Sequence, residues 1–169
     1  MALLGPEHKE SVQENAAEAL LMILTISDTK SSLVLKIHSE EIVSELFRHT
    51  MADASVTSSS LRNGLTIISE LIAHLSDVFA ASDDEQQLPP VLASLETHLP
   101  ALKGLLESRS GQSMPTSFGK VDSPFGPTRL KVLELFASVV KTKYEAFVYR
   151  IMIDQGVFVT CMVRCLKSN

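Results

Sequence analysis

The cysteines and histidines are the residues of this sequence that could bind a metal ion. Cys161 and Cys165 are spaced i, i+4, which places both thiols on one face of a helix and supplies half of a zinc site. The same spacing would strain a disulfide, so we expect none between them. A zinc site needs a converging tetrahedral set, and the histidines lie on different segments, so structural roles are favoured over metal binding. These histidines are His8, His38, His49, His74 and His98.

Serine nucleophiles, paired carboxylates and glycine-rich phosphate loops would each indicate an enzyme. Ser110-Gly111 lacks the companion glycine of a G-x-S-x-G turn. Glu40 and Glu41 stand at an expected helix start, where the helix dipole accounts for two carboxylates. The glycines of residues 111–126 lack the flanking strand and helix of a phosphate-binding loop. The sequence therefore predicts no catalytic residue, no cofactor and no metal, and a protein that is not an enzyme.

Composition indicates a folded protein with an uneven charge distribution. The chain has 169 residues, 45% of them hydrophobic and 21% charged, which is enough apolar surface for one core. The net charge of −5 divides into −10 up to Leu102 (5 basic, 15 acidic residues) and +5 beyond it (10 basic, 5 acidic residues). The basic part could dock an acidic partner. Nucleic-acid binding would need denser lysine and arginine with interleaved aromatic residues, and we do not expect it.

The sequence also lacks the features of membrane insertion and secretion. No apolar run has the length that a membrane span needs, and the first residues lack the basic region, apolar run and cleavage site of a signal peptide. We expect no membrane association and a location in the cytoplasm, with the nucleus as a further compartment.

Helical periodicity runs through most of the chain, because apolar residues recur at i, i+3, i+4 and i+7. A short apolar segment at 33–37 precedes Ser39, a candidate N-cap, and Pro100 should kink or interrupt its helix. Residues 108–126 are rich in Gly, Pro and Ser and are expected to form one long internal loop. The helices are expected at 7–26, 40–47, 61–79, 91–105, 127–141, 144–153 and 157–166.

The helix expected at 127–141 has apolar residues in two stripes, so we expect it to be the most buried helix. Its main stripe is Leu130, Leu133, Phe136, Ala137 and Val140, and Val132, Leu135 and Val139 form the second. We find no convincing β-hairpin signal, and the fold class is all-α. A stacked helical array and a compact bundle both satisfy this pattern, because no repeat of fixed period is visible.

One ordered motif lies within residues 117–143, SFGKVDSPFGPTRLKVLELFASVVKTK. It follows the pattern G-x-[LV]-x-x-P-[LF]-G-x-x-R-L. This motif resembles a signature of the SAPS family, regulatory subunits of phosphatase 6-type Ser/Thr protein phosphatases. ENAAEALLMIL, SSSLRNGLTIISELI and residues 146–169 resemble other family segments more weakly, so the resemblance covers most of the chain. The matching positions are Gly119, Val121, Pro124, Phe125, Gly126, Arg129 and Leu130, with Asn15, Ala16, Ala17, Leu61, Asn63 and Gly64 upstream.

The resemblance implies a fold and a partner. It implies stacked antiparallel helices in an armadillo- or HEAT-like repeat array, as one domain of residues 1–169 that is part of a longer helical-repeat domain. The implied partner is a phosphatase 6-type catalytic subunit, with other adaptor proteins as further partners. Phe125, Arg129 and Lys131 are the candidate partner-binding residues. The metal-binding motifs of the phosphatase itself, G-D-x-H-G and G-N-H-E, do not occur in the sequence.

Local features of the motif support this interpretation. Phe125 would plug the loop onto the core, Gly126 and Pro127 would fix the start of the helix, and Arg129 would point from its first turn. A cation near a helix N-terminus is unfavourable towards the dipole, so Arg129 requires a carboxylate such as Asp122 or an acidic group on a partner.

Two alternatives remain open. A generic armadillo- or HEAT-like adaptor unrelated to phosphatases would show the same periodicity. A small helical enzyme or ligand carrier would need a concave apolar pocket with converging polar groups.

Overall fold

The computed structural model describes residues 2–5, 7–52, 58–79, 88–108, 113–117, 119–122 and 125–167, with only the backbone described at 2, 113–116, 119–122 and 164–167. Helices make up most of it. The elements are η1 (Ala2–Leu4), α1 (Glu10–Ile26), α2 (Ser32–Ile37), α3 (Glu40–Met51), α4 (Ser59–Ala73), α5 (Leu75–Val78), α6 (Pro90–Glu107), β1 (Ser113–Thr116), β2 (Gly119–Asp122), α7 (Pro127–Val140), α8 (Glu145–Tyr149), η2 (Arg150–Asp154) and α9 (Val157–Lys167).

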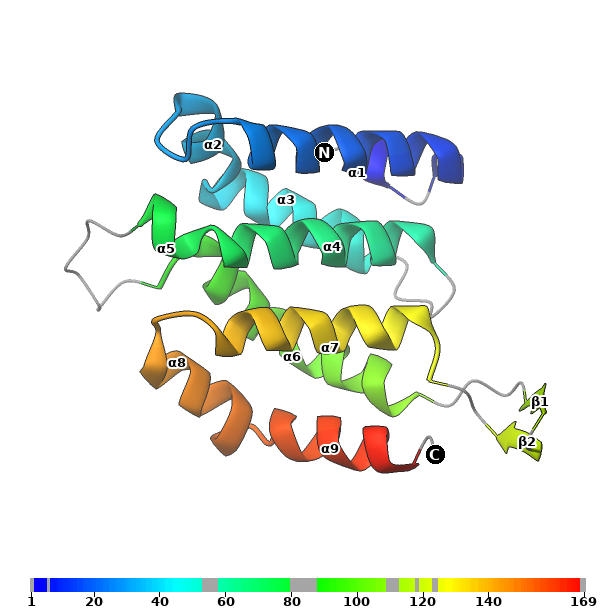
Figure 1. Cartoon of the computed structure of the whole chain (residues 1–169). Coiled ribbons are helices and arrows are strands. Elements are labelled where there is room, and N and C mark those ends of the chain that lie inside the picture. Colours follow the sequence, from blue (N-terminus) through cyan, green and yellow to red (C-terminus); the bar gives the residue numbers. More distant parts are fainter. Residues whose placement is uncertain are drawn as a thin grey trace.

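The long helices form a two-layered stack. Helices α1, α4 and α7 lie side by side in one layer and run in the same direction, while α3 and α6 return behind them (Figure 1). Helix α9 packs against α6 and against η2. The prediction of an all-α fold made of packed helices is confirmed, and the assignment of this stack to an armadillo- or HEAT-like repeat stays a prediction.

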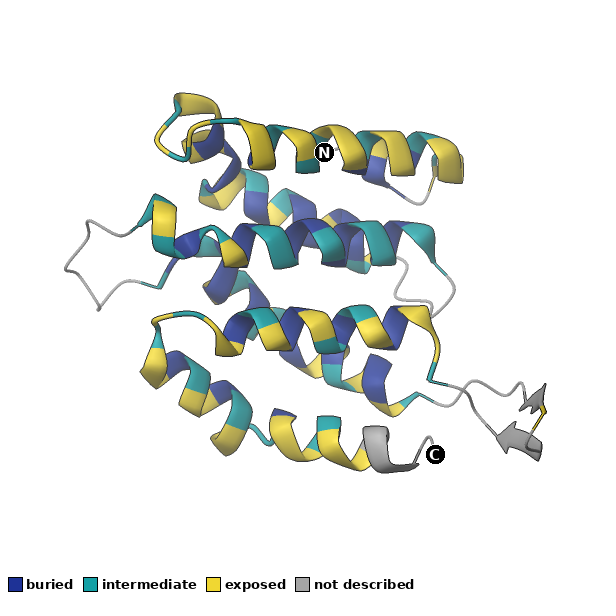
Figure 2. Ribbon diagram, viewed as in Figure 1, coloured by how far each residue is buried: buried dark blue, intermediate teal, exposed yellow. Residues whose placement is uncertain are grey.

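Helix α4 is the centre of the stack. It packs against α1, α3, α6 and α7, and eight of its 15 residues are buried, Ser60, Leu61, Gly64, Leu65, Ile67, Ile68, Leu71 and Ile72. Most of the α4 ribbon is coloured as buried or intermediate, whereas buried and exposed residues alternate along α7 (Figure 2). The prediction that α7 is the most buried helix is therefore wrong.

Helix α7 turns its second stripe, not its main stripe, towards the core. Val132, Leu135 and Val139 have no exposed surface, whereas Leu130 and Val140 are each 50% exposed. Phe136 is buried and Leu133 is partly buried against the core. Both stripes are apolar, so the sequence alone does not determine which of them faces α4.

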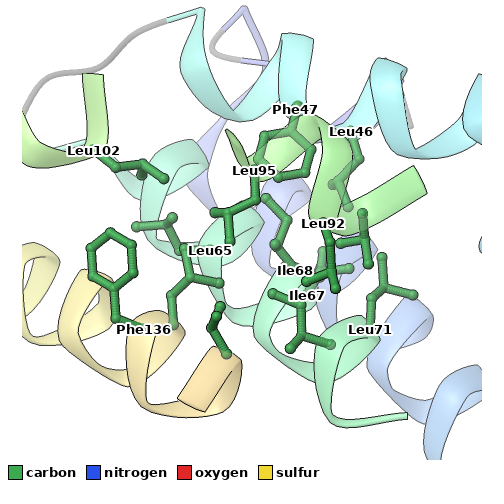
Figure 3. Close-up of a cluster of buried hydrophobic side chains, with 14 of the residues drawn as sticks. Leu46, Phe47, Leu65, Ile67, Ile68, Leu71, Leu92, Leu95, Leu102 and Phe136 are labelled. Carbon is green, nitrogen blue, oxygen red and sulfur yellow. The ribbon is translucent and has the colours of Figure 1, made fainter. Parts of the chain in front are cut away.

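The core joins side chains from four helices. Leu46 and Phe47 of α3, Leu65 and Ile68 of α4, Leu92 and Leu95 of α6, and Phe136 of α7 converge in one cluster (Figure 3). Each of these side chains is at most 2% exposed. Full burial of such a side chain is worth about 1.5–3 kcal/mol, so this cluster contributes strongly to the stability of the fold.

Several helix ends agree with the sequence and others do not. Pro127 is the first residue of α7, and Gly126 precedes it with φ 74°, a left-handed conformation that glycine adopts readily. Ser39 precedes α3, but its side chain makes no capping hydrogen bond. Pro100 lies inside a continuous α6 and does not interrupt it. Its ring faces solvent there, away from the packed side of the helix.

The connection from α6 to α7 contains a β-hairpin that the sequence analysis missed. Strands β1 and β2 pair antiparallel in the register Ser113↔Asp122, Met114↔Val121, Pro115↔Lys120 and Thr116↔Gly119. Each strand has four residues, too few for an alternating apolar pattern to be recognised, and a proline within the first strand argues against a strand assignment. The hairpin is a small β element in an otherwise helical fold.

No single helix in the described part of the chain has both the length and the apolar content of a membrane span. The pair Glu145–Asp154 and Val157–Val163 meets that test jointly, with a bend of 54° between its parts. Within the same described residues, no three His, Cys, Asp or Glu side chains are placed to hold a metal ion. The side chains of Asp122 and Cys165 lie outside the described residues, so the expectations about these two residues stay predictions.

Candidate functional site

A groove of about 760 Å³ crosses the α3 and α6 side of the stack. Its volume falls in the range of about 300–1,000 Å³ that is usual for ligand sites. Four separate segments of the chain line it, and their residues are Glu40, Ser44, Phe79, Leu88, Pro89, Pro90, Ala93, Ser94, Thr97, His98 and Tyr144.

Helix geometry sets the two long sides of the groove. Glu40 and Ser44 are four residues apart on α3 and therefore share one face. Ala93 and Thr97 have the same spacing on α6, and both are exposed. Short side chains on this face of α6 let a bound molecule approach the helix closely.

The ring of His98, which lines the groove, is held in one orientation. Its ring stacks on Phe47, with the centroids 5.0 Å apart and the planes 25° from parallel. Its Nδ1 lies 2.8 Å from the backbone oxygen of Ser94. A carbonyl oxygen only accepts, so Nδ1 carries a proton, and in the neutral ring Nε2 is left as an acceptor.

Phe79 forms one wall and is supported from behind by a buried histidine. The rings of His38 and Phe79 meet edge to face with centroids 5.8 Å apart, and His38 is 3% exposed. Burial lowers the pKa of His38 to about 4, with the charge of His74 as a smaller cause. His38 is therefore neutral near pH 7 and presents no charge behind the wall.

Tyr144 also lines the groove, from the turn before α8. Partial burial raises the pKa of its phenol, which keeps the group neutral at physiological pH. Glu40 is the one Asp, Glu, Lys or Arg among the lining residues. The groove therefore combines two aromatic side chains, one carboxylate and an imidazole acceptor.

This arrangement is suited to recognition. Ser44 and Ser94 lie with His98 in the groove, but the Nδ1 of His98 is used by a backbone carbonyl and not to orient an acid-base pair. The ligand-carrier alternative required a concave site of this kind, and the groove provides one, so that alternative stays a prediction.

The structure brings two of the three predicted site residues together. The guanidinium carbon of Arg129 lies 6.0 Å from the centre of the Phe125 ring, within cation–π distance. Arg129 is 4% exposed, and Phe125 is partly buried against the core. Lys131 is turned away from this pair and binds Glu134, with Nζ 2.7 Å from Oε2. Partner contact by these residues stays a prediction; Lys131 and Phe125 are both partly exposed, whereas Arg129 is buried.

Sequence analysis did not identify the groove. The helix dipole explains Glu40 at the start of α3, and this explanation holds locally. The groove exists because α3, α5, α6 and the turn at Tyr144 meet in space, and no sequence spacing connects them. Tyr144 could have been noticed as one of two tyrosines in the chain, but nothing in its surroundings marks it.

Comparison with known proteins gives one match. The family model described as SAPS, SIT4 phosphatase-associated protein, matches residues 1–155. Neither the curated proteins nor the solved structures gave a match. The match covers α1 to α8 and η2, including the groove and the Phe125–Arg129 pair.

Proposed function

This chain belongs to the family of SIT4 phosphatase-associated proteins, and on that premise we propose that it is a non-catalytic regulatory subunit of a Ser/Thr protein phosphatase. It binds a phosphatase 6-type catalytic subunit and influences the substrate choice or the location of that enzyme. The observation that carries the proposal is the family match over residues 1–155, which covers the described stack up to the end of η2.

Exposed apolar side chains support a scaffold role. They gather on the outermost elements of the stack, where no further helix covers them within the described chain. Apolar patches of this kind mark protein interaction sites. On α1 and α2 they are Met22, Ile26, Leu33 and Leu35, and on η2 and α9 they are Ile153, Phe158, Val159, Met162 and Val163.

The test is capture of a purified catalytic subunit by the immobilised chain. We expect retention of a phosphatase 6-type subunit above that of an unrelated Ser/Thr phosphatase at the same concentration. The chain alone should release no phosphate from p-nitrophenyl phosphate. Equal retention of both phosphatases, or of neither, would contradict the proposal.

A generic helical adaptor is the second candidate, favoured by the layered stack of helices itself. The two candidates differ in one outcome. A generic adaptor captures no phosphatase. A regulatory subunit captures the phosphatase in the absence of other proteins.

A further inference from the structure

We propose that the groove between α3 and α6 is a peptide-binding site that receives a Lys or Arg side chain of an extended partner segment. The site goes beyond the proposed function, because it does not require contact with a phosphatase. It is available on this chain alone.

The charge of the ligand follows from the groups that line the groove. Glu40 is exposed and forms no ion pair within the described residues, whereas its neighbour Glu41 binds Lys36, with Nζ 2.5 Å from Oε2. His98 adds the Nε2 acceptor, and the Thr97 hydroxyl already donates to the Ala93 backbone oxygen at 3.1 Å, leaving its lone pairs to accept. A group rich in N–H donors and positively charged satisfies these acceptors, and an anion does not.

The charges that flank the groove in the sequence are of both signs and do not by themselves select a ligand. Asp77 of α5 comes two residues before Phe79, and Lys143 comes directly before Tyr144, but neither lines the groove. Glu96 of α6 is neutralised by Arg150, with Nη2 2.9 Å from Oε2. Among the described lining residues Glu40 is the one charged side chain, and it is offset by the dipole of α3 and not by an ion pair, so it can attract a cation.

The walls suit the rest of a lysine or arginine side chain. Phe79 and Tyr144 provide aromatic rings that a cation can contact, and Leu88 with Pro90 provides apolar surface for its methylene stem. The exposed Ala93 and Thr97 leave room for the backbone of the bound segment. A volume of about 760 Å³ exceeds one side chain, so neighbouring residues of the segment also fit.

The test uses four degenerate nonapeptide libraries, each with one fixed central residue: Arg, Lys, Leu or Glu. The immobilised full-length chain is incubated with each library, and the retained peptide is quantified. We expect the Arg and Lys libraries to be retained at least threefold above the Leu library, and the Glu library below it.

Two neighbouring substitutions provide matched variants. Glu40→Gln removes the groove carboxylate, and Glu41→Gln removes an adjacent carboxylate in the same first helical turn, outside the lining. Both lose the same interaction with the helix dipole, and Glu41→Gln also loses the exposed ion pair with Lys36, so its melting temperature should be equal to or slightly below that of Glu40→Gln. Glu40→Gln should reduce Arg-library retention to the Leu level, and Glu41→Gln should leave it unchanged.

Three results would overturn the proposal. They are preferential retention of the Leu or Glu library, equal retention of all four, and equal effects of Glu40→Gln and Glu41→Gln. Phosphatase capture by Glu40→Gln separates the two proposals, because it should be normal if the groove is distinct from the phosphatase contact.

Discussion

Thr50 of α3 lies directly against the backbone of Gly64 of α4. A Cβ atom built on Gly64 would fall 2.0 Å from the Oγ1 of Thr50. Thr50 is 1% exposed and its hydroxyl donates to the Leu46 backbone oxygen at 2.7 Å, so its side chain is fixed. The two helices approach so closely at this point that only glycine fits.

Gly64→Ala should therefore destabilise the protein, although alanine is the better helix former. Overpacking of this kind costs about 1–3 kcal/mol. Gly104→Ala on α6 is the control, because a Cβ at that site meets nothing within 4 Å. It should stabilise the protein by roughly 0.5–1 kcal/mol through helix propensity. Urea denaturation followed by circular dichroism measures both, and a stabilised Gly64→Ala would refute the close approach.

Stability should fall as the pH drops from 6.5 towards 4, because of His38. The pKa of His38 is about 4 in the folded protein and 6.5 in the unfolded chain, so the unfolded chain binds more protons in this interval. The stability that depends on His38 being neutral is fully present above pH 6.5 and is lost as the pH falls to about 4. The difference corresponds to about 3 kcal/mol at most.

His38→Phe tests this interpretation, since a phenyl ring keeps the edge-to-face contact with Phe79 and does not titrate. The free energy of unfolding of this variant should vary less between pH 6.5 and 4.5 than that of the wild type. The Glu45 carboxyl, whose pKa is held at about 2 chiefly by the hydrogen bond from Arg48, also loses stabilisation as the pH falls below its unfolded value, but it does so equally in both proteins and cancels in the comparison. An unchanged pH profile would assign the acid sensitivity to other groups.

Arg129→Ala should act mainly on the fold and lower the melting temperature; any loss of partner binding should follow from that destabilisation. The guanidinium is buried beside Phe125, so truncation removes packing and a desolvated cation–π contact, on the order of 2 kcal/mol. Lys131→Ala removes an exposed pair with Glu134 and should cost less than about 1 kcal/mol. Thermal denaturation and phosphatase capture, measured on both variants, separate support of the fold from partner contact.

Gln13 should be required for docking of the N-terminal segment. Its Nε2 donates to the backbone oxygens of Gly5 and His8, both at 2.9 Å, and its Oε1 accepts from Ser59 at 2.5 Å. Gln13→Leu leaves these buried carbonyls without their donor, at a cost of about 1–3 kcal/mol. Leu4, 1% exposed at present, should then become protease-accessible earlier than in Glu14→Leu, an exposed control on the same helix. Identical digestion of both variants would contradict this role.

Leu135→Ala and Leu133→Ala test which stripe of α7 faces the core. Leu135 has no exposed surface and its truncation should cost about 2–5 kcal/mol, whereas the partly buried Leu133 should cost clearly less. Equal costs of the two substitutions would support the sequence prediction that the main stripe, which contains Leu133, faces the core.

The same two leucines show what the sequence can and cannot predict. Periodicity and the Gly126-Pro127 pair located α7 to within a residue, because these signals are local. The rotation of α7 about its axis depends on α4, to which no local pattern refers. The groove has the same origin, since Glu40 and Tyr144 become neighbours of one cavity only after the layers pack. Ser39 occupies the N-cap position of α3 as predicted, but its hydroxyl makes no capping hydrogen bond.

The sharing of α4 by α1 and α7 has a mechanical consequence. Helix α1 packs on α4 and α4 packs on α7, so the angle between the two outer helices is the sum of two crossings in series. A rotation of a few degrees at each crossing adds up at the ends of the stack. Bending at either crossing also requires α3 and α6 to repack behind it, and a partner that spans α1 and α7 would sense both crossings.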